Sequence, residues 1–241
     1  MQCKINAPLF TKIVDSIKDL NPHANFDFTP QGLHFQVMDS AHVSLSSLSL
    51  PKDSFEEYVC EHGITLGIHL KSLLIVLKGS TGPLTMQTQG DKLTVQVAKN
   101  SGIANYSLNL MDIDSDQLSL PDITYDAVST LPSSVFTKVM RDMTDFSDTC
   151  SICIGDSLTV TNSGDMGKAQ WNSGEDCDCK AIQATEPLQF SVSYLCQFSK
   201  ACAVSPTLII GLKADTPACF TFPVKSGYLR FYLAPKIEGD E

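Results

Sequence analysis

The sequence lacks a run of about 20 consecutive apolar residues, the length that a membrane-spanning helix requires. Its first ten residues, MQCKINAPLF, also lack the long apolar stretch of a secretory signal. These two absences argue against a helical membrane protein and against a secreted one, so we expect a soluble intracellular protein. With 43% hydrophobic residues, the chain can still build a sizeable core.

Sequence motifs of catalysis are also missing. The chain has no Walker A lysine loop, no GxGxxG, no HExxH and no GxSxG. The five histidines are scattered through the first half, at His23, His34, His42, His62 and His69. An enzyme needs catalytic groups that are held together, and no such set can be assembled here. We therefore predict no enzymatic activity, no catalytic residues and no cofactor.

The nine cysteines do not follow the spacing of a zinc site. Cys150 and Cys153 form one close pair, and Cys177 and Cys179 form another. Neither pair is accompanied by a second pair or by a histidine at zinc-finger spacing. We predict reduced thiols, several of them small core residues, and no bound metal. A thiol- or metal-dependent enzyme built on one of these pairs is the alternative, and metal analysis of the purified protein tests it.

Positive charge is scarce, with 17 Lys and Arg residues against 27 Asp and Glu residues and a net charge of −10. Taken alone, this balance argues against a general nucleic-acid-binding protein. The distribution of the cations along the chain matters more than their total.

A segment that occurs twice is the most informative feature that is present. Residues 10–20 read FTKIVDSIKDL and residues 136–146 read FTKVMRDMTDF. The copies lie 126 positions apart in a chain of 241 residues, which indicates two related halves. Each copy predicts an amphipathic helix, because its apolar residues fall on one face of a helical wheel.

Each half continues with strand-like runs, a second helix and further strands. The second helices are predicted over residues 70–78 and 193–202. The acidic segment that contains Pro121 reads as a linker between the halves. We predict an α+β fold of two similar domains, each with two helices packed on antiparallel sheets. The predicted boundaries are 1–111 for the first domain, 112–124 for the linker and 125–241 for the second domain.

The basic residues are concentrated on these four predicted helices. Seven of the 17 lie there, namely Lys12, Lys18, Lys71, Lys78, Lys138, Arg141 and Lys200. They could be the ordinary solvent-exposed faces of amphipathic helices. They could also form one basic face on an otherwise acidic body, which would contact DNA phosphates without reading base sequence. The pattern leaves both interpretations open.

Four motifs resemble the proliferating cell nuclear antigen family, the eukaryotic DNA sliding clamps. They are residues 38–45 (MDSAHVSL), 110–114 (LMDID), 117–121 (QLSLP) and 232–238 (YLAPKIE). The resemblance extends over nearly the whole chain. It implies a homotrimer, three chains joined head to tail in a ring, with the helices lining the hole and the sheets outside. The implied function is a nuclear DNA polymerase processivity factor that encircles duplex DNA and recruits replication and repair proteins.

The resemblance also implies binding sites. The seven helix cations would face double-stranded DNA. DNA polymerase, the clamp loader and other proteins that carry a Gln-aliphatic-aromatic-aromatic motif would dock in a groove under the linker. The implied groove residues are Met38, His42, Val43, Leu45, Leu118, Leu120, Pro121, Pro217, Tyr232, Ala234 and Pro235.

For the subunit interface, the resemblance implies Tyr106 of one chain against Met143 and Phe146 of the next. Residues 105–109 and 168–172 are the candidate edge strands that pair across it. An alternative within the same architecture is one subunit of a heterotrimeric checkpoint-type clamp, and self-association of this chain alone separates the two. The chain departs from the family at Gly155, where a modified lysine is usual, and at Cys177 and Cys179, for which the resemblance offers no role.

Overall fold

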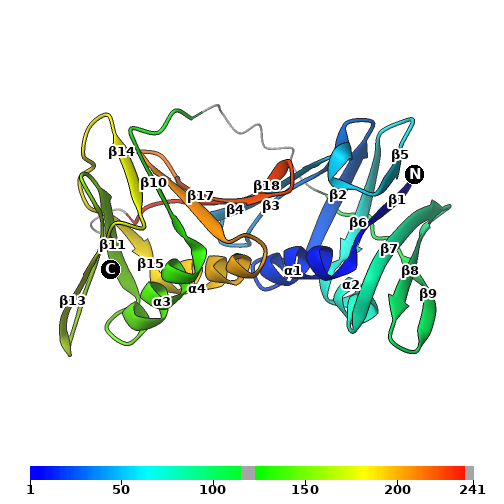
Figure 1. Cartoon of the computed structure of the whole chain (residues 1–241), viewed down its shortest axis with the longest axis horizontal. Coiled ribbons are helices and arrows are strands. Elements are labelled where there is room, and N and C mark those ends of the chain that lie inside the picture. Colours follow the sequence, from blue (N-terminus) through cyan, green and yellow to red (C-terminus); the bar gives the residue numbers. More distant parts are fainter. Residues whose placement is uncertain (115–122, 237–241) are drawn as a thin grey trace. The chain divides into compact units, whose positions relative to one another are not determined.

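A computed structural model describes residues 1–114 and 123–236 of the chain (Figure 1). The chain divides into two compact units. Unit 1 comprises Met1–Ser40, Ser46–Leu118 and Val224–Leu229, and unit 2 comprises Ala41–Leu45, Ser119–Pro223 and Arg230–Glu241. Most of the predicted linker, residues 115–122, lies outside the described part of the chain.

Unit 1 contains helices α1 (Ala7–Ile17) and α2 (Leu70–Leu77), which pack against each other. A five-stranded antiparallel sheet has the order β5-β1-β7-β8-β9, and α1 packs on its strand β7. Strand β2 pairs with β3 and with β6. The elements of this unit are β1 (Gln2–Asn6), β2 (His23–Thr29), β3 (Gly32–Met38), the 3-10 helix η1 (Lys52–Ser54), β5 (Glu57–Val59), β6 (Ile64–His69), β7 (Ser80–Gln89), β8 (Lys92–Lys99) and β9 (Gly102–Asn109).

Unit 2 repeats this plan with helices α3 (Ser133–Thr144) and α4 (Val192–Phe198), which also pack together. Its four-stranded sheet has the order β13-β12-β11-β15, and β10 pairs antiparallel with β14 and with β16. Strands β4 (Ser44–Pro51), β17 (Ala218–Val224) and β18 (Gly227–Leu233) contain residues of both units. The remaining strands are β10 (Ala127–Pro132), β11 (Thr149–Ile154), β12 (Leu158–Gly164), β13 (Gly167–Asn172), β14 (Asp178–Ala181), β15 (Leu188–Ser191) and β16 (Thr207–Leu212).

The sequence repeat is a structural repeat, since equivalent positions of α1 and α3 are buried in their own units. Four apolar residues of α1 are at most 1% exposed, and the four at equivalent positions of α3 are at most 5% exposed. The matched pairs are Phe10 and Phe136, Ile13 and Val139, Val14 and Met140, and Ile17 and Met143. The prediction of an α+β fold with two similar domains is thereby confirmed.

The helix boundaries differ from the predicted ones at the ends. Helix α1 begins at Ala7 because the Asn6 side chain caps it, its Oδ1 accepting the Leu9 N–H at 2.9 Å. It ends at Ile17, three residues before the predicted end, and Lys18 is its C-cap residue. Helix α4 ends at Phe198 and continues as the 3-10 helix η2 (Ser199–Ala203), so the prediction of one α-helix over 193–202 was wrong for residues 199–202.

An aromatic cluster in unit 2 fixes the end of α4 on the core. The Phe198 ring stacks on Phe231 with centroids 4.6 Å apart and lies 5.5 Å from Phe220. All three side chains are fully buried. Because α4 is anchored through this buried face, its opposite face and the start of η2 are turned toward solvent.

Candidate nucleic-acid interface

Six of the seven predicted helix cations are exposed on the helices of their own unit. In unit 1, α1 carries Lys12, while Lys71 and Lys78 lie at the start and the C-cap of α2. Unit 2 carries Lys138 and Arg141 on α3 and Lys200 on η2. We call these six residues the exposed helix cations. Each helix buries an apolar face in the core of its unit, although Ile75 of α2 is 73% exposed.

The seventh helix cation, Lys18, has its charge compensated locally by carboxylates. Its Nζ contacts a carboxylate oxygen of Asp15 and lies 3.5 Å from Asp19 Oδ2. The hydrogen bond to Asp15 raises the pKa of the Lys18 ammonium. This neutralisation was not predicted, although the spacing of Asp15 and Lys18, one helical turn apart, was the available signal. Lys18 therefore offers less net charge to a phosphate than its neighbours do.

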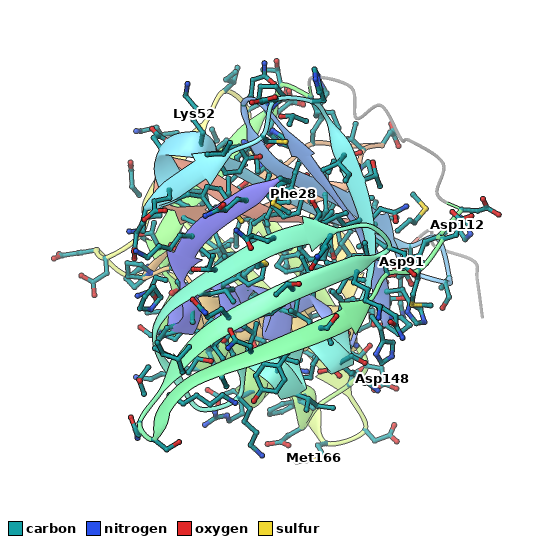
Figure 2. All side chains as sticks on the ribbon, turned by 90° about the vertical axis from the view of Figure 1, so that its right-hand side faces the viewer. Phe28, Lys52, Asp91, Asp112, Asp148 and Met166 are labelled. Carbon is teal, nitrogen blue, oxygen red and sulfur yellow. The ribbon has the colours of Figure 1, made fainter. Side chains whose placement is uncertain are left out.

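Acidic residues are sparse on the same helices and frequent elsewhere. The segments of α2 and of α4 with η2 contain no Asp or Glu. By contrast, Asp91, Asp112 and Asp148 are exposed residues outside the helices and strands, and Figure 2 shows their side chains at the surface. Within each unit, a basic helix surface therefore belongs to a body that is acidic overall.

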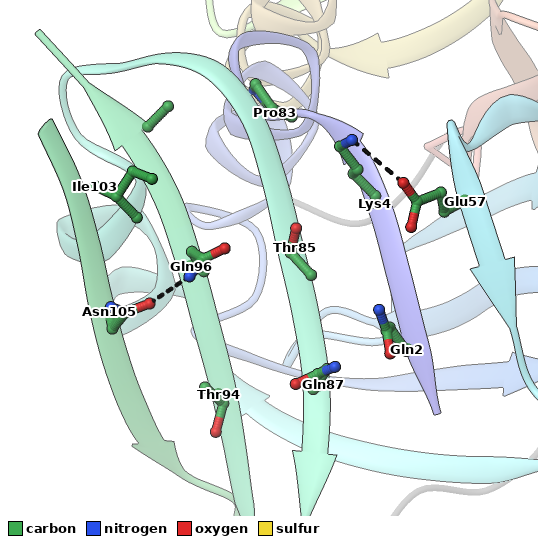
Figure 3. A pocket seen from close by; sticks show the side chains of 11 residues that line it. Gln2, Lys4, Glu57, Pro83, Thr85, Gln87, Thr94, Gln96, Ile103 and Asn105 are labelled. Carbon is green, nitrogen blue, oxygen red and sulfur yellow. Dashed lines mark hydrogen bonds and ion pairs between the residues drawn. The ribbon is translucent and has the colours of Figure 1, made fainter.

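A shallow hollow of about 460 Å³ on the five-stranded sheet of unit 1 has a different character (Figure 3). Its lining is rich in amides and hydroxyls, and Gln96 Nε2 donates to Asn105 Oδ1 at 2.9 Å. Its single cation, Lys4, has its Nζ 3.3 Å from Glu57 Oε1. No Cys or His lines the hollow, so it offers no such nucleophile or base, and its cation is already paired. Because Lys4 is paired with Glu57, the hollow offers little net positive charge to a phosphate.

The predicted groove residues that are described lie mainly in unit 2. Met38 ends β3 in unit 1 and is half-buried, while Leu118, Leu120 and Pro121 lie outside the described residues. We call the others the partner surface: His42, Val43, Leu45, Pro217, Tyr232, Ala234 and Pro235.

Side chains of the partner surface range from exposed to buried. His42 and Pro217 are exposed, Val43 is 37% exposed, and Leu45 is a core residue at 5%. The Ala234 N–H donates to the Val43 carbonyl at 3.0 Å, which joins the segment after β18 to the segment before β4. His42 adopts φ +58°, a left-handed conformation that is uncommon for a non-glycine residue and that is often found at binding sites.

Tyr125 joins this surface, although the sequence-based prediction omitted it. Its hydroxyl donates to the Pro217 carbonyl at 3.2 Å, and its ring occupies the space beside Gly211, where a Cβ would lie 2.7 Å from the ring. Burial, followed by proximity to Cys219 and Tyr232, raises the pKa of the Tyr125 hydroxyl. The available signal was an aromatic residue at the end of the linker. Tyr125 is half-buried, and its hydrogen bond ties it to the backbone of Pro217.

The predicted interface residues lie in three different environments. Tyr106 is on β9, the last strand of its sheet, where Lys99 Nζ donates to its hydroxyl at 2.9 Å and lies 5.1 Å from its ring centroid. Phe146 is half-buried just beyond α3, and Met143 is a core residue at 3% exposure. The candidate edge segments 105–109 and 168–172 lie on β9 and β13, which stand at the ends of their sheets.

The cysteine pairs do not form a metal centre among residues 1–114 and 123–236, where no group of three or more His, Cys, Asp or Glu side chains could hold an ion. Cys150 is 1% exposed, and burial raises the pKa of its thiol to about 12. A thiol with so high a pKa is almost entirely protonated at neutral pH and is a poor nucleophile.

Among residues 1–114 and 123–236, every helix is too short or too polar to span a lipid bilayer.

Two repeated α+β units whose paired helices present cations define a two-domain DNA clamp. Comparison with known families agrees: the model of the proliferating cell nuclear antigen N-terminal domain matches residues 2–118, and that of the C-terminal domain matches residues 119–237. Proliferating cell nuclear antigen of Caenorhabditis elegans is 35% identical over 253 residues, covering 98% of this chain and 96% of the relative. The chain therefore belongs to the proliferating cell nuclear antigen family. It is a DNA sliding clamp and a processivity factor of DNA replication.

Proposed function

We propose that three copies of this chain close into a ring that holds duplex DNA against the exposed helix cations. The observation that carries the proposal is the arrangement of each helix, with an apolar face buried in its unit and cations on the exposed face. Contacts of these cations with phosphates are weak and independent of base sequence, so the ring can slide. The acidic remainder of the surface disfavours DNA outside the hole. In this role the protein makes and breaks no covalent bond and needs no cofactor.

We propose that β9 of one chain pairs with β13 of the next. Each strand stands at the end of its sheet, so its outer backbone groups are open to a partner strand. Exposed apolar side chains accompany both edges: Ile103 on β9 is 70% exposed (Figure 3), and Met166, in the turn before β13, is 75% exposed (Figure 2). Tyr106 and Phe146 would add aromatic contacts, with Met143 supporting Phe146 from the core. A head-to-tail contact of this kind closes into a ring when its rotation suits.

We propose that the partner surface, together with Met38 and the linker residues, binds proteins that carry a Gln-aliphatic-aromatic-aromatic motif on one helical turn. An apolar surface that accepts a short helix is a common mode of peptide recognition. Val43 and Pro217 offer exposed apolar contacts, and His42 offers a polar one. DNA polymerase, the clamp loader and repair proteins in the nucleus are the proposed partners. Tethering a polymerase to a ring on DNA keeps it at high local concentration near the primer end.

The ring proposal is tested by topology, without a clamp loader. The wild-type protein is incubated with a linear duplex that carries biotin at both ends, and streptavidin is added either before or after the protein. A ring must thread over a free end, so we expect DNA-bound protein that survives a high-salt wash only when streptavidin is added second.

Two controls sharpen the experiment. Cutting the duplex in its middle after trapping should release the protein, because the new ends are open. Equal retention with streptavidin added first would show ordinary surface binding and would contradict an encircling ring.

A further inference from the structure

The Cys177-Asp-Cys179 segment forms a close pair of thiols in unit 2. The two Sγ atoms lie 3.8 Å apart. Asp178 and Cys179 belong to β14, and Cys177 immediately precedes that strand. Both cysteines are half-buried, whereas Asp178 and Lys180 are exposed and pair with each other at 3.1 Å. Successive side chains of a β-strand point to opposite faces, so the two thiols lie on one side of the strand and the ion pair lies on the other.

A buried hydroxyl from the neighbouring strand holds the two sulfurs together. Ser129 on β10 is opposite Cys179 in the antiparallel register and is fully buried. Its Oγ lies 3.0 Å from Cys177 Sγ and accepts from the Cys179 thiol at 3.4 Å. The thiols are thus oriented toward each other by the fold as well as by their proximity in sequence.

The two cysteines differ in their freedom to move. Cys179 is fixed in the ladder by its pairing with Ser129. Cys177 lies in the turn before the strand, where its N–H donates to the Gly174 carbonyl at 3.2 Å. A disulfide needs an S–S separation of about 2.05 Å. The turn that contains Gly174 can supply this closing movement while β14 keeps its register.

We propose that Cys177 and Cys179 form a reversible dithiol–disulfide site whose oxidant is a small-molecule disulfide. One cysteine thiolate attacks a sulfur of the small disulfide, which forms a mixed disulfide and releases one thiolate. The other cysteine, after losing its proton, attacks the cysteine sulfur of the mixed disulfide and releases the second thiolate. In total the protein loses two hydrogens, and the small disulfide is reduced to two thiols.

The environment of the pair makes this exchange slow at neutral pH. Burial raises the pKa of the Cys177 thiol, and only the thiolate attacks a disulfide. The rate of closure should therefore increase with pH. The site is suited to equilibrating with the thiol pool over time rather than to rapid reaction with an oxidant.

Trypsin provides a direct measurement, since cleavage after Lys168 and Lys180 releases residues 169–180 with Cys177 and Cys179 as their only cysteines. The folded protein is equilibrated with mixtures of oxidised and reduced glutathione, quenched with an alkylating agent, digested and weighed by mass spectrometry. We expect most of peptide 169–180 to be unalkylated and two hydrogens lighter than its dithiol form. The yield of this internal disulfide should exceed that of the glutathione mixed disulfide of the same peptide by roughly tenfold. Peptide 181–200, which holds Cys196 alone, is the internal control and should be alkylated or glutathionylated.

Two cysteine variants and a sample unfolded in urea test whether the disulfide depends on this pair and on the fold. Cys177→Ser should leave Cys179 able to form only the mixed disulfide, while Cys196→Ser should leave the 169–180 disulfide unchanged. Recovery of peptide 169–180 as the dithiol, even in fully oxidised glutathione, would overturn the proposal. An equal yield of the internal disulfide from protein unfolded in urea would also overturn it, because sequence proximity alone would then explain the bond.

Discussion

Replacing both Lys78 and Lys138 with glutamate is expected to reduce clamp-stimulated DNA synthesis by roughly tenfold or more at physiological salt. Lys78 is the exposed C-cap residue of α2 in unit 1, and Lys138 is exposed on α3 in unit 2. Each reversal removes a phosphate contact and adds a repulsive charge. In the proposed ring the change recurs in all three subunits, so six cations become anions around the duplex.

The measurement is primer extension by a clamp-dependent DNA polymerase on a linear primed template, onto which the ring can thread without a loader. Product length is compared over a range of salt concentrations, because lost phosphate contacts also reduce the salt dependence. The matched control is Lys52→Glu with Lys92→Glu, which makes the same change in net charge. Lys52, labelled in Figure 2, lies on η1 and Lys92 on β8, and both are exposed residues outside the four helices.

The charge-reversal variant must also keep its fold and its oligomeric state. A glutamate at the Lys78 C-cap interacts unfavourably with the helix dipole by about 0.3–1 kcal/mol, too little to unfold the unit. Wild-type product length from Lys78→Glu/Lys138→Glu, or an equal loss in the Lys52→Glu/Lys92→Glu control, would count against a basic helix surface that faces DNA.

Val43→Glu is expected to weaken binding of a Gln-aliphatic-aromatic-aromatic peptide by at least about 2 kcal/mol, roughly thirtyfold in Kd. The Val43 side chain is 37% exposed, so the free protein tolerates a carboxylate there at little cost. Its backbone carbonyl still accepts the Ala234 N–H, and this bond does not depend on the side chain. A docked apolar helix would bury the new charge without a partner.

Calorimetric titration of a synthetic peptide carrying the motif measures this effect. Val59→Glu is the matched control, because Val59 is 57% exposed on β5 and lies outside the partner surface. We expect wild-type affinity from Val59→Glu. Unchanged affinity in Val43→Glu would show that the peptide docks elsewhere and that Val43 has only a structural role.

The helices and their buried faces were predictable because local periodicity determines them. The repeat placed Phe10 and Phe136 at equivalent positions, and both are buried in the fold. The ends of the helices were less predictable. The Asn6 cap moves the start of α1 to Ala7, and the segment around Lys200 is a 3-10 helix, which the apolar periodicity does not distinguish from an α-helix.

The candidate sites depend on contacts between residues that are distant in sequence. Tyr125 reaches the Pro217 carbonyl across 92 positions, and Ser129 reaches Cys177 across 48 positions. Neither contact leaves a periodic signal. Met143, by contrast, does have a periodic signal. The resemblance implies a place for it at the subunit interface, whereas the amphipathic pattern of α3 places it in the core. In the structure Met143 is 3% exposed and belongs to the core.

The most direct test of the central claim is the absolute mass of the purified chain by light scattering across a dilution series. For a homotrimeric ring we expect a mass near three times 26.2 kDa that holds on dilution. Tyr106→Ala should lower that mass toward the monomer, because it removes an aromatic contact from the β9 edge. A wild-type chain that is monomeric at every concentration would contradict a homotrimeric ring and would favour a clamp assembled from different subunits.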